Sequence, residues 1–286
     1  MRLRQRLHTR FPLLDPALLP GGFDRVGDIA LLTLADAVTG HAHSLAEAIL
    51  EDCPFLRVVA QREGRHHGEF RIPRLHLLAG EKRLTTVHRE NGITLHLDIA
   101  RVYFSVRLAH ERARIATQVL PGESVAVLGS GIGPFPLIIG KYSAARQVVG
   151  IEKNPAAHDY ALRNLAANRI PCPVRLLPGD VATMLPTLRE RFDRILVAVP
   201  YGGDRLLAHA LDALRPGGML HLYAMREEGR TDPVHEAMTL AGKAGYLLQP
   251  LRVVRCGHCG VALDRICLDA RVGPFSDASF SPACTA

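Results

Sequence analysis

The sequence lacks the features that mark a membrane-spanning or secreted protein. No apolar run among its 286 residues approaches the ~20 that a membrane helix needs. The first ten residues contain four arginines and no apolar centre, unlike a secretory signal. The six cysteines are too sparse in the sequence to indicate a disulfide framework. These absences predict a protein of the reducing cytoplasm without a membrane partner.

Lysine is scarce as well, since only four of the 35 basic residues are lysine. An excess of arginine is typical of a GC-rich, bacterial coding sequence. The net charge of +7 permits a polyanionic partner, but the basic residues are not gathered in one segment. The charge therefore favours a nucleic-acid partner only weakly.

The sequence also lacks a metal motif of established spacing. It contains 14 histidines, yet no H-E-x-x-H pair occurs. The segment Cys256-Gly-His-Cys259 offers half of a zinc ribbon, and Cys267 follows it. Small buried thiols in a hairpin explain these residues better than metal ligands do. We predict no catalytic metal.

The most informative feature present is an apolar run at 124–128 followed by three glycines at alternate positions, Gly129, Gly131 and Gly133. Glycines after a buried strand allow a sharp turn and a close approach of the backbone to a ligand. A second apolar run ends in Glu152, which suits a carboxylate that accepts hydrogen bonds from ribose hydroxyls. The spacing differs from that of dinucleotide folds, and no basic cradle for a pyrophosphate follows. The pattern predicts S-adenosyl-L-methionine as the cofactor.

From residue 124 the pattern alternates strand and helix, which predicts an α/β fold, the Rossmann-like class I fold of S-adenosylmethionine-dependent methyltransferases. Two apolar runs without a helix between them then predict an antiparallel pair at one edge. The predicted strands are 124–128, 147–152, 173–177, 193–199 and 218–223, the helices 134–144, 155–168, 180–189, 203–214 and 232–244, and the antiparallel pair 246–254 and 261–272.

The preceding part predicts a small α+β domain at 19–100, after a basic arm at 1–18. The transferase domain is expected at 101–286, with a connecting helix at 101–122. Within the small domain, short strands are predicted at 28–34, 56–60, 75–78 and 94–99, with a helix at 45–51.

Several further motifs resemble the archaeal and eukaryotic tRNA (guanine-N1)-methyltransferases and their relatives, the wybutosine-pathway aminocarboxypropyltransferases. The resemblance covers about residues 19–272. Its motifs are Leu19-Pro-Gly-Gly-Phe-Asp-Arg-Val-Gly-Asp-Ile-Ala30, Gly68-Glu-Phe-Arg71, Leu78-Ala-Gly-Glu81, Val87-His-Arg-Glu-Asn-Gly92, Val102-Tyr-Phe-Ser-Val-Arg-Leu-Ala-His-Glu-Arg112 and Gly131-Ile-Gly-Pro-Phe135.

The resemblance implies roles for four residues of the acceptor site. Glu111 stands where the family has its general base, and Arg71 where an arginine faces the purine oxygen. Tyr103 and Arg107 would line the pocket. Independently, Arg107, Glu111 and Arg114 fall at i, i+4 and i+7 on one helical face. Without the resemblance, a solvated charge pair would explain them.

The resemblance also implies cofactor contacts at Asn154, Asp180, Ala198 and Pro200. Asp180 suits the adenine amino group, and it equally suits a helix N-cap. Three departures stand out. Ala198 replaces an asparagine that helps to hold the target base, Val127 replaces an acidic residue, and the family's elbow-binding domain is not expected before Leu19.

These departures leave the transferred group and the acceptor open. The favoured hypothesis is transfer of the 3-amino-3-carboxypropyl group to the phenolic oxygen of a small molecule, as in isonocardicin synthase and antibiotic biosynthesis. The alternative is N1-methylation of guanosine in tRNA. A third hypothesis, a non-catalytic RNA-binding relative, is disfavoured because Gly131, Glu152 and Glu111 are all present. No oligomeric state is predicted.

Overall fold

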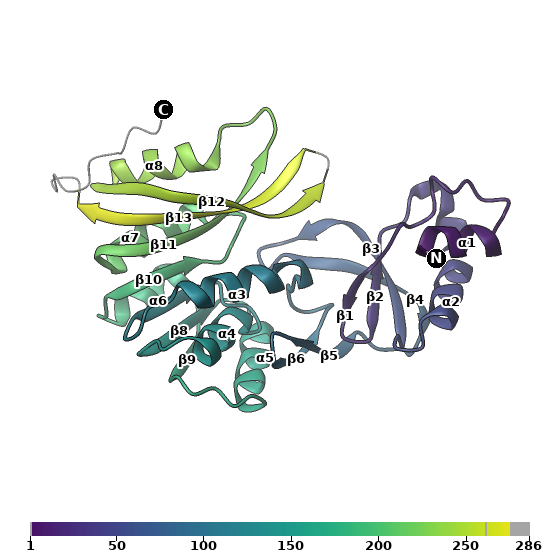
Figure 1. Cartoon of the computed structure of the whole chain (residues 1–286), viewed down its shortest axis with the longest axis horizontal. Coiled ribbons are helices and arrows are strands. Elements are labelled where there is room, and N and C mark those ends of the chain that lie inside the picture. Colours follow the sequence, from purple (N-terminus) through teal and green to yellow (C-terminus); the bar gives the residue numbers. More distant parts are fainter. Residues whose placement is uncertain (1, 261, 275–286) are drawn as a thin grey trace. The chain divides into compact units, whose positions relative to one another are not determined.

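The computed structural model describes residues 2–260 and 262–274, which form two compact units, Met1–Val106 and Arg107–Ala286 (Figure 1). The division lies six residues after the boundary expected at residue 100. No helix in the described ranges combines the length and apolarity needed to cross a membrane.

The first unit contains a four-stranded sheet in the order β1-β2-β3-β4 and a separate hairpin of β5 and β6. Strands β2 and β3 run parallel, and α2 forms the crossover between them and packs on β3 and β4. The elements are α1 (Leu3–Arg10), β1 (Asp24–Val26), β2 (Ile29–Leu32), η1 (Asp36–His41), α2 (Ala42–Asp52), β3 (Val58–His67), β4 (Ile72–Gly80), β5 (Thr85–Glu90) and β6 (Ile93–Asp98).

Residues 3–10 form a packed helix rather than a separate basic arm. Leu3 and Leu7 lie one turn apart on the same face and enter the core that α2 also builds. The Arg10 guanidinium pairs with the Glu51 carboxylate at 2.6 Å, so part of the positive charge that suggested an arm is neutralised within the unit.

The turn between β1 and β2 is locked to strand β5. Arg83 donates two hydrogen bonds to the Asp28 carboxylate, at 3.1 and 2.5 Å, and Thr86 Oγ1 donates a third at 2.7 Å. These contacts hold the pKa of Asp28 below its usual range, with the Arg83 hydrogen bond the largest cause. Gly27 has φ 59°, and its N–H donates to His88 Nδ1 at 3.1 Å. The motif around residues 19–30 therefore has a structural explanation.

We expect Gly27→Ala to lower the free energy of unfolding by about 3 kcal/mol. Alanine would have to adopt the left-handed backbone conformation of Gly27, and its methyl group would overlap neighbouring atoms. A Cβ there would lie 2.2 Å from Thr86 Oγ1 and 2.6 Å from the Val87 carbonyl oxygen. Gly22→Ala is the matched control, because nothing lies within 4 Å of a Cβ at that site. Urea unfolding would measure the stability of both variants. Equal unfolding midpoints would contradict the close packing of the β1–β2 turn against β5.

The second unit is built on a seven-stranded sheet in the order β12-β13-β11-β10-β7-β8-β9. Strands β11, β10, β7, β8 and β9 run parallel, and β13 runs antiparallel to both β11 and β12. The elements are η2 (Val106–Leu108), α3 (Ala109–Gln118), β7 (Ser124–Leu128), α4 (Pro134–Tyr142), β8 (Gln147–Glu152), α5 (Pro155–Ala166), β9 (Val174–Pro178), α6 (Val181–Thr187), β10 (Phe192–Val197), α7 (Asp204–Ala213), β11 (Leu214–Glu227), α8 (Pro233–Lys243), β12 (Tyr246–Gly260) and β13 (Leu263–Pro274).

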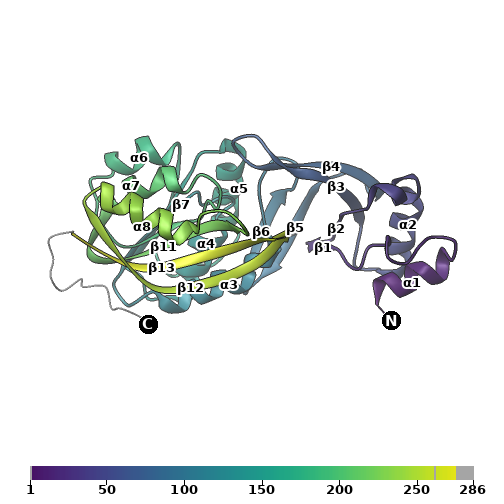
Figure 2. The same cartoon turned by 90° about the horizontal axis from the view of Figure 1, so that it is seen from above.

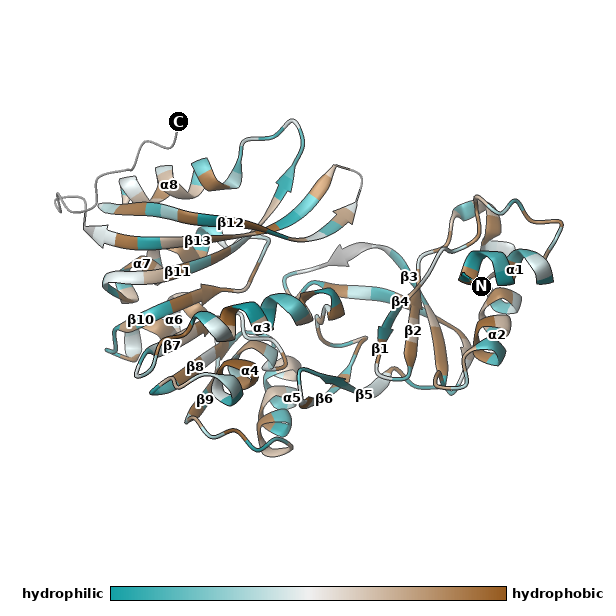
Figure 3. Ribbon diagram, in the orientation of Figure 1, coloured by the Kyte–Doolittle hydropathy of each residue, from teal (hydrophilic) through white to brown (hydrophobic). Residues whose placement is uncertain are grey.

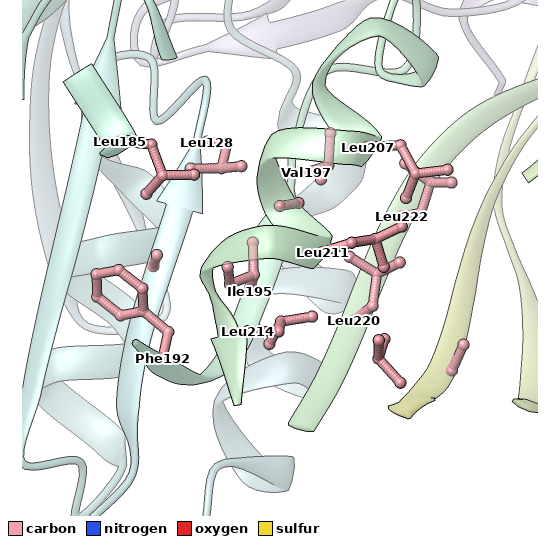
Figure 4. Packing of buried hydrophobic residues seen from close by; sticks show 14 of the residues in the cluster. Leu128, Leu185, Phe192, Ile195, Val197, Leu207, Leu211, Leu214, Leu220 and Leu222 are labelled. Atoms are coloured by element: carbon pink, nitrogen blue, oxygen red, sulfur yellow. The ribbon is translucent and has the colours of Figure 1, made fainter. Parts of the chain in front are cut away.

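This sheet confirms the predicted α/β alternation and the antiparallel pair at one edge. Helices α6, α7 and α8 lie on one side of it and α3 lies on the other (Figure 2). The central parallel strands are almost wholly buried and apolar (Figure 3). Leu185 of α6 and Leu207 of α7 pack on Leu128, Val197 and neighbouring residues (Figure 4). This packing fixes the carboxyl ends of β7, β8 and β10, where the candidate site lies.

Candidate active site

A glycine loop joins β7 to α4. Gly129, Gly131 and Gly133 have φ values of 74°, 58° and 87°, a region that favours glycine. A Cβ on Gly129 would lie 2.3 Å from Val199 Cγ2, so the loop passes too close to the segment after β10 for a side chain. The N–H groups of Gly129 and Ser130 both donate to the Ile151 carbonyl oxygen. The loop is therefore held between the end of β8 and the segment after β10. Its glycines leave the backbone open to close approach by a ligand.

Glu152 ends β8 with its carboxylate turned to this loop. Its two oxygens accept from the N–H of Gly131 and from the N–H of Asn154, each at 2.7 Å. Burial raises the pKa of Glu152, and the backbone donors oppose that rise. The carboxylate thus both orders the loop and provides acceptor oxygens beside it. These residues fit a nucleoside with free ribose hydroxyls, which remains the predicted role of Glu152.

The next two candidate residues cap helices. The Asn154 side chain accepts from the N–H of Ala156 at the start of α5, and the Asp180 side chain accepts from the N–H of Ala182 at the start of α6. Asp180 is also paired with Lys153, Nζ to Oδ2 at 2.6 Å, and this bond is the largest cause of its lowered pKa. The N-cap explanation of Asp180 is confirmed. A contact with adenine stays a prediction, for which each carboxylate oxygen keeps a further acceptor position.

Ala198 and Pro200 follow β10 at the point where the strand order reverses. Strand β7 lies between β8 and β10, and open α/β sheets bind ligands at such a switch point. The Ala198 N–H donates to the Leu128 carbonyl oxygen at 2.9 Å. The methyl side chain of Ala198 offers no hydrogen bond to a base edge.

Glu111 is buried rather than solvated, so the surface charge pair considered from the sequence is wrong. Only 3% of the residue is exposed. Arg114 donates to both of its oxygens, Nε to Oε2 at 2.8 Å and Nη2 to Oε1 at 2.6 Å, and the Tyr223 hydroxyl donates to Oε1 at 2.9 Å. Burial opposes ionisation, but Arg114 and Tyr223 outweigh it and lower the pKa of Glu111. Glu111 is therefore held as a carboxylate.

The polar residues that form further hydrogen bonds with the Glu111–Arg114 pair were not predicted from the sequence. Arg114 also binds Asp269 of β13, Nη1 to Oδ2 at 2.5 Å, and Asp269 Oδ1 contacts His221 Nδ1 of β11 at 2.6 Å. His221 Nε2 contacts Arg194 Nη1 of β10 at 2.6 Å. A signal was present, because His221 and Tyr223 are polar residues at alternate positions within the otherwise apolar run 219–225 of β11 and so share a face.

The remaining acceptor-site candidates belong to different parts of the structure. Arg107 is exposed in η2 and donates from Nη1 to the His258 carbonyl oxygen at 3.2 Å. Arg107 lies outside the α-helix that carries Glu111 and Arg114, since residues 106–108 form a 3-10 turn and α3 begins at Ala109. Arg71, in the turn between β3 and β4, has φ 53°, and Tyr103 lies in the same first unit. Their roles stay predictions.

Cys256 and Cys259 do not belong to a group with metal-ligand proximity among the residues that the structure describes. Among the described residues one group has metal-ligand proximity, His221, Cys267 and Asp269, with atoms within 4.8 Å of one another. Two arginines already donate to this group, which disfavours a cation there. Cys256 is half-buried, and burial together with the nearby Glu111 carboxylate raises the pKa of its thiol to about 12. The thiols of Cys256 and Cys267 therefore stay protonated at neutral pH.

A glycine loop ordered by an acidic strand end, at the switch point of a sheet with this strand order, defines a Rossmann-like S-adenosylmethionine-dependent transferase. Comparison with known proteins narrows the class. The TRM5/TYW2 methyltransferase domain matches residues 86–247, and the TYW2 N-terminal domain matches residues 3–83. The chain belongs to the TRM5/TYW2 methyltransferase family. The predicted family and enzyme class are confirmed.

Two curated relatives illustrate the range of the family. The tRNA (guanine(37)-N(1))-methyltransferase Trm5b of Pyrococcus abyssi is 35% identical over 246 residues, which are 83% of this chain and 71% of the relative. The tRNA(Phe) (4-demethylwyosine(37)-C(7)) aminocarboxypropyltransferase of Pyrococcus horikoshii is 29% identical over 280 residues, 95% of this chain and 96% of the relative.

Solved structures agree with these matches. The crystal structure of Trm5b from Pyrococcus abyssi has a TM-score of 0.79 and 31% identity, over 93% of this chain and 78% of that chain. The Pyrococcus horikoshii TYW2 complex with MeSAdo has a TM-score of 0.77 and 26% identity, over 96% of this chain and all of that chain. The complex of aTrm5 and tRNALeu has a TM-score of 0.81 and 27% identity, over 95% of this chain and 78% of that chain.

Proposed function

We propose that this enzyme transfers the 3-amino-3-carboxypropyl group of S-adenosylmethionine to a purine-derived base at position 37 of tRNA. The observation that carries the choice of group is the side chain at Ala198, which cannot make the base contact of the asparagine expected in N1-methyltransferases. The match of residues 3–83 to the TYW2 N-terminal domain supports the same choice. The position of the acceptor follows the relatives, which act on nucleotide 37 of tRNA.

The phenolic small-molecule acceptor and a role in antibiotic biosynthesis stay predictions without support among the relatives, which are tRNA-modifying enzymes. Small acceptors and tRNA differ in one measurable respect. An enzyme that neutralises many phosphates binds more weakly as salt rises, with a slope close to the number of contacts. The dependence of KM on salt therefore separates the two acceptor classes.

The chemistry assigns one task to each part of the site. The sulfonium of the bound cofactor supplies an activated carbon. Gly129, Gly131 and Glu152 hold the nucleoside, and Ala198 and Pro200 border it. Glu111 accepts the proton that leaves the attacking atom of the base, while the departing sulfur keeps the electron pair of the broken bond. Orientation of the methionine tail decides which carbon is attacked.

N1-methylation of guanosine 37 is the second candidate. It is favoured by the identity of 35% with Trm5b of Pyrococcus abyssi, higher than the 29% shared with the aminocarboxypropyltransferase. The Glu111 carboxylate would serve the same purpose, since a ring N–H must also lose a proton to a base.

The by-product identifies the transferred group. We expect methylthioadenosine when the enzyme is incubated with S-adenosylmethionine and tRNA carrying the precursor base, because loss of the aminocarboxypropyl group leaves the methyl group on sulfur. Chromatography of the nucleoside products measures it, with tRNA lacking a purine at position 37 as the control. Accumulation of S-adenosylhomocysteine, with methyl label in tRNA, would replace the proposal by N1-methylation.

A further inference from the structure

A continuous set of polar and charged side chains connects Glu111 to Glu123 along the face of the sheet that α3 covers. Arg114 joins Glu111 to Asp269, Asp269 joins Arg114 to His221, and Arg194 joins His221 to the Glu123 carboxylate at 2.7 Å. These residues come from α3, β13, β11, β10 and the segment before β7. We call this set the Glu111 network.

The Glu111 network is almost wholly shielded from solvent, with Arg114 and Glu123 its most exposed members. Side-chain exposure is 4% for Glu111 and Asp269, 12% for Arg114 and zero for His221. Buried ion pairs lose much of their attraction to desolvation, and well-packed apolar residues often give a fold of equal or greater stability. Stability alone therefore explains the network poorly, and its position beside a candidate catalytic carboxylate calls for another explanation.

The hydrogen bonds fix the protonation state of His221. Its Nε2 faces a guanidinium, which can only donate, and its Nδ1 faces the Asp269 carboxylate, which accepts. His221 is accordingly neutral with its proton on Nδ1, and burial lowers its pKa in the same direction. Asp269 Oδ1 is thereby held in one orientation, with Arg114 on its other side.

Arg114 divides its donors between two carboxylates. Nε faces Glu111, Nη1 faces Asp269, and Nη2 lies 2.6 Å from Glu111 Oε1 and 3.1 Å from Asp269 Oδ1. An arginine with Glu111 as its sole partner would make that carboxylate a weaker base, whereas the Asp269 charge acts in the opposite direction. The ionisable groups that face Glu111 are Arg114 on α3, Tyr223 on β11, Cys256 on β12, and Cys267 and Asp269 on β13.

We propose that Asp269 is a positioning residue for Glu111: by holding one edge of the Arg114 guanidinium, it fixes Arg114 and limits how fully Arg114 neutralises the Glu111 carboxylate. This proposal rests on the proposed function, in which Glu111 accepts a proton from the acceptor base. His221 in turn fixes the orientation of Asp269, because its Nδ1–H donates to Asp269 Oδ1. Neither residue needs to touch the substrate.

A double-mutant cycle tests whether Asp269 acts through Glu111. Asp269→Asn is expected to lower the single-turnover rate on tRNA about tenfold, the effect of one charged hydrogen bond, with cofactor affinity within about twofold of wild type, because the glycine loop is untouched. In a Glu111→Gln background the same substitution should change the rate by less than about twofold. Asp212→Asn, an exposed aspartate on α7, is the matched control. Equal slowing in both backgrounds, or no slowing in either, would overturn the proposal.

A titration tests the coupling without turnover. Nuclear magnetic resonance of isotope-labelled glutamate, assigned with Glu111→Gln, should show the pKa of Glu111 rising in Arg114→Gln and falling in Asp269→Asn. An unchanged Glu111 titration in Arg114→Gln would overturn the proposal even if Asp269→Asn fails to fold. If wild-type enzyme transfers no group to tRNA, the proposed function fails, while the titration still decides whether Asp269 controls Glu111.

Discussion

Glu111→Gln is expected to lower turnover about 10²–10⁴-fold, the range typical of removing a general base. Glutamine keeps the shape of the side chain but cannot accept a proton at neutral pH. The proposed cofactor contacts lie on the glycine loop and Glu152, whose carboxylate accepts from the loop and from Asn154, so affinity for S-adenosylmethionine should stay within about twofold. Single-turnover transfer from labelled cofactor measures the rate, and calorimetry measures the affinity.

Loss of folding and loss of one negative charge must be separated from loss of the base in Glu111→Gln. The substitution leaves Arg114 bound to Asp269, so the buried guanidinium keeps one counter-ion and the fold should survive. Glu236→Gln, at an exposed position of α8, controls for the loss of one negative charge. If cofactor affinity collapses while bound substrate still reacts at the wild-type rate, Glu111 is a structural residue and the base lies elsewhere.

The lowered pKa of Glu111 has a consequence for pH dependence. A carboxyl whose pKa is depressed stays ionised until the pH falls through that depressed value, so Glu111 itself should not limit activity between pH 5 and 8. The ionised form is the one that accepts a proton, but a low pKa also makes it a modest base. Because Asp269 also binds Arg114, its charge opposes the lowering of the Glu111 pKa by Arg114 and so keeps Glu111 a stronger base.

The local parts of the fold were predictable because they rest on short-range patterns. The apolar run at 124–128, the glycines after it and Glu152 at the next strand end require only backbone sterics and strand burial to be interpreted. The antiparallel pair at the sheet edge followed from two apolar runs without a helix between them. In the first unit, β5 at Thr85–Glu90 was missed, because five of its six residues are polar or charged and Val87 is its one apolar residue.

The Glu111 network was not predictable to the same degree, because its members are distant in the chain. Arg114 and Asp269 are separated by 155 positions, and His221 and Asp269 by 48. Their meeting depends on β13 pairing with β11 in a register that places Asp269 opposite His221. Sequence periodicity indicates the face on which each lies, but register between distant strands follows from tertiary packing.

Glu152→Ala is expected to weaken binding of S-adenosylmethionine about 100-fold, because two hydrogen bonds to a charged acceptor contribute about 1.5–3 kcal/mol each. Part of the loss comes from the loop itself, since the Gly131 N–H loses its acceptor at the same time. Glu152→Gln keeps one acceptor oxygen and should lose about tenfold. Asp159→Ala, an exposed acid on α5, is the matched control for charge.

The raised pKa of Glu152 adds a signature that separates ribose binding from loop support. Ionised Glu152 is the better acceptor, so wild-type affinity should fall as the pH is lowered through its raised pKa, at a higher pH than for an ordinary glutamate. Glu152→Ala should lack this dependence. Calorimetry across pH 5 to 8, with 2′-deoxyribose and ribose forms of the cofactor, completes the test. If Glu152→Ala discriminates against the deoxy form as strongly as wild type does, Glu152 supports the loop and another group binds the ribose.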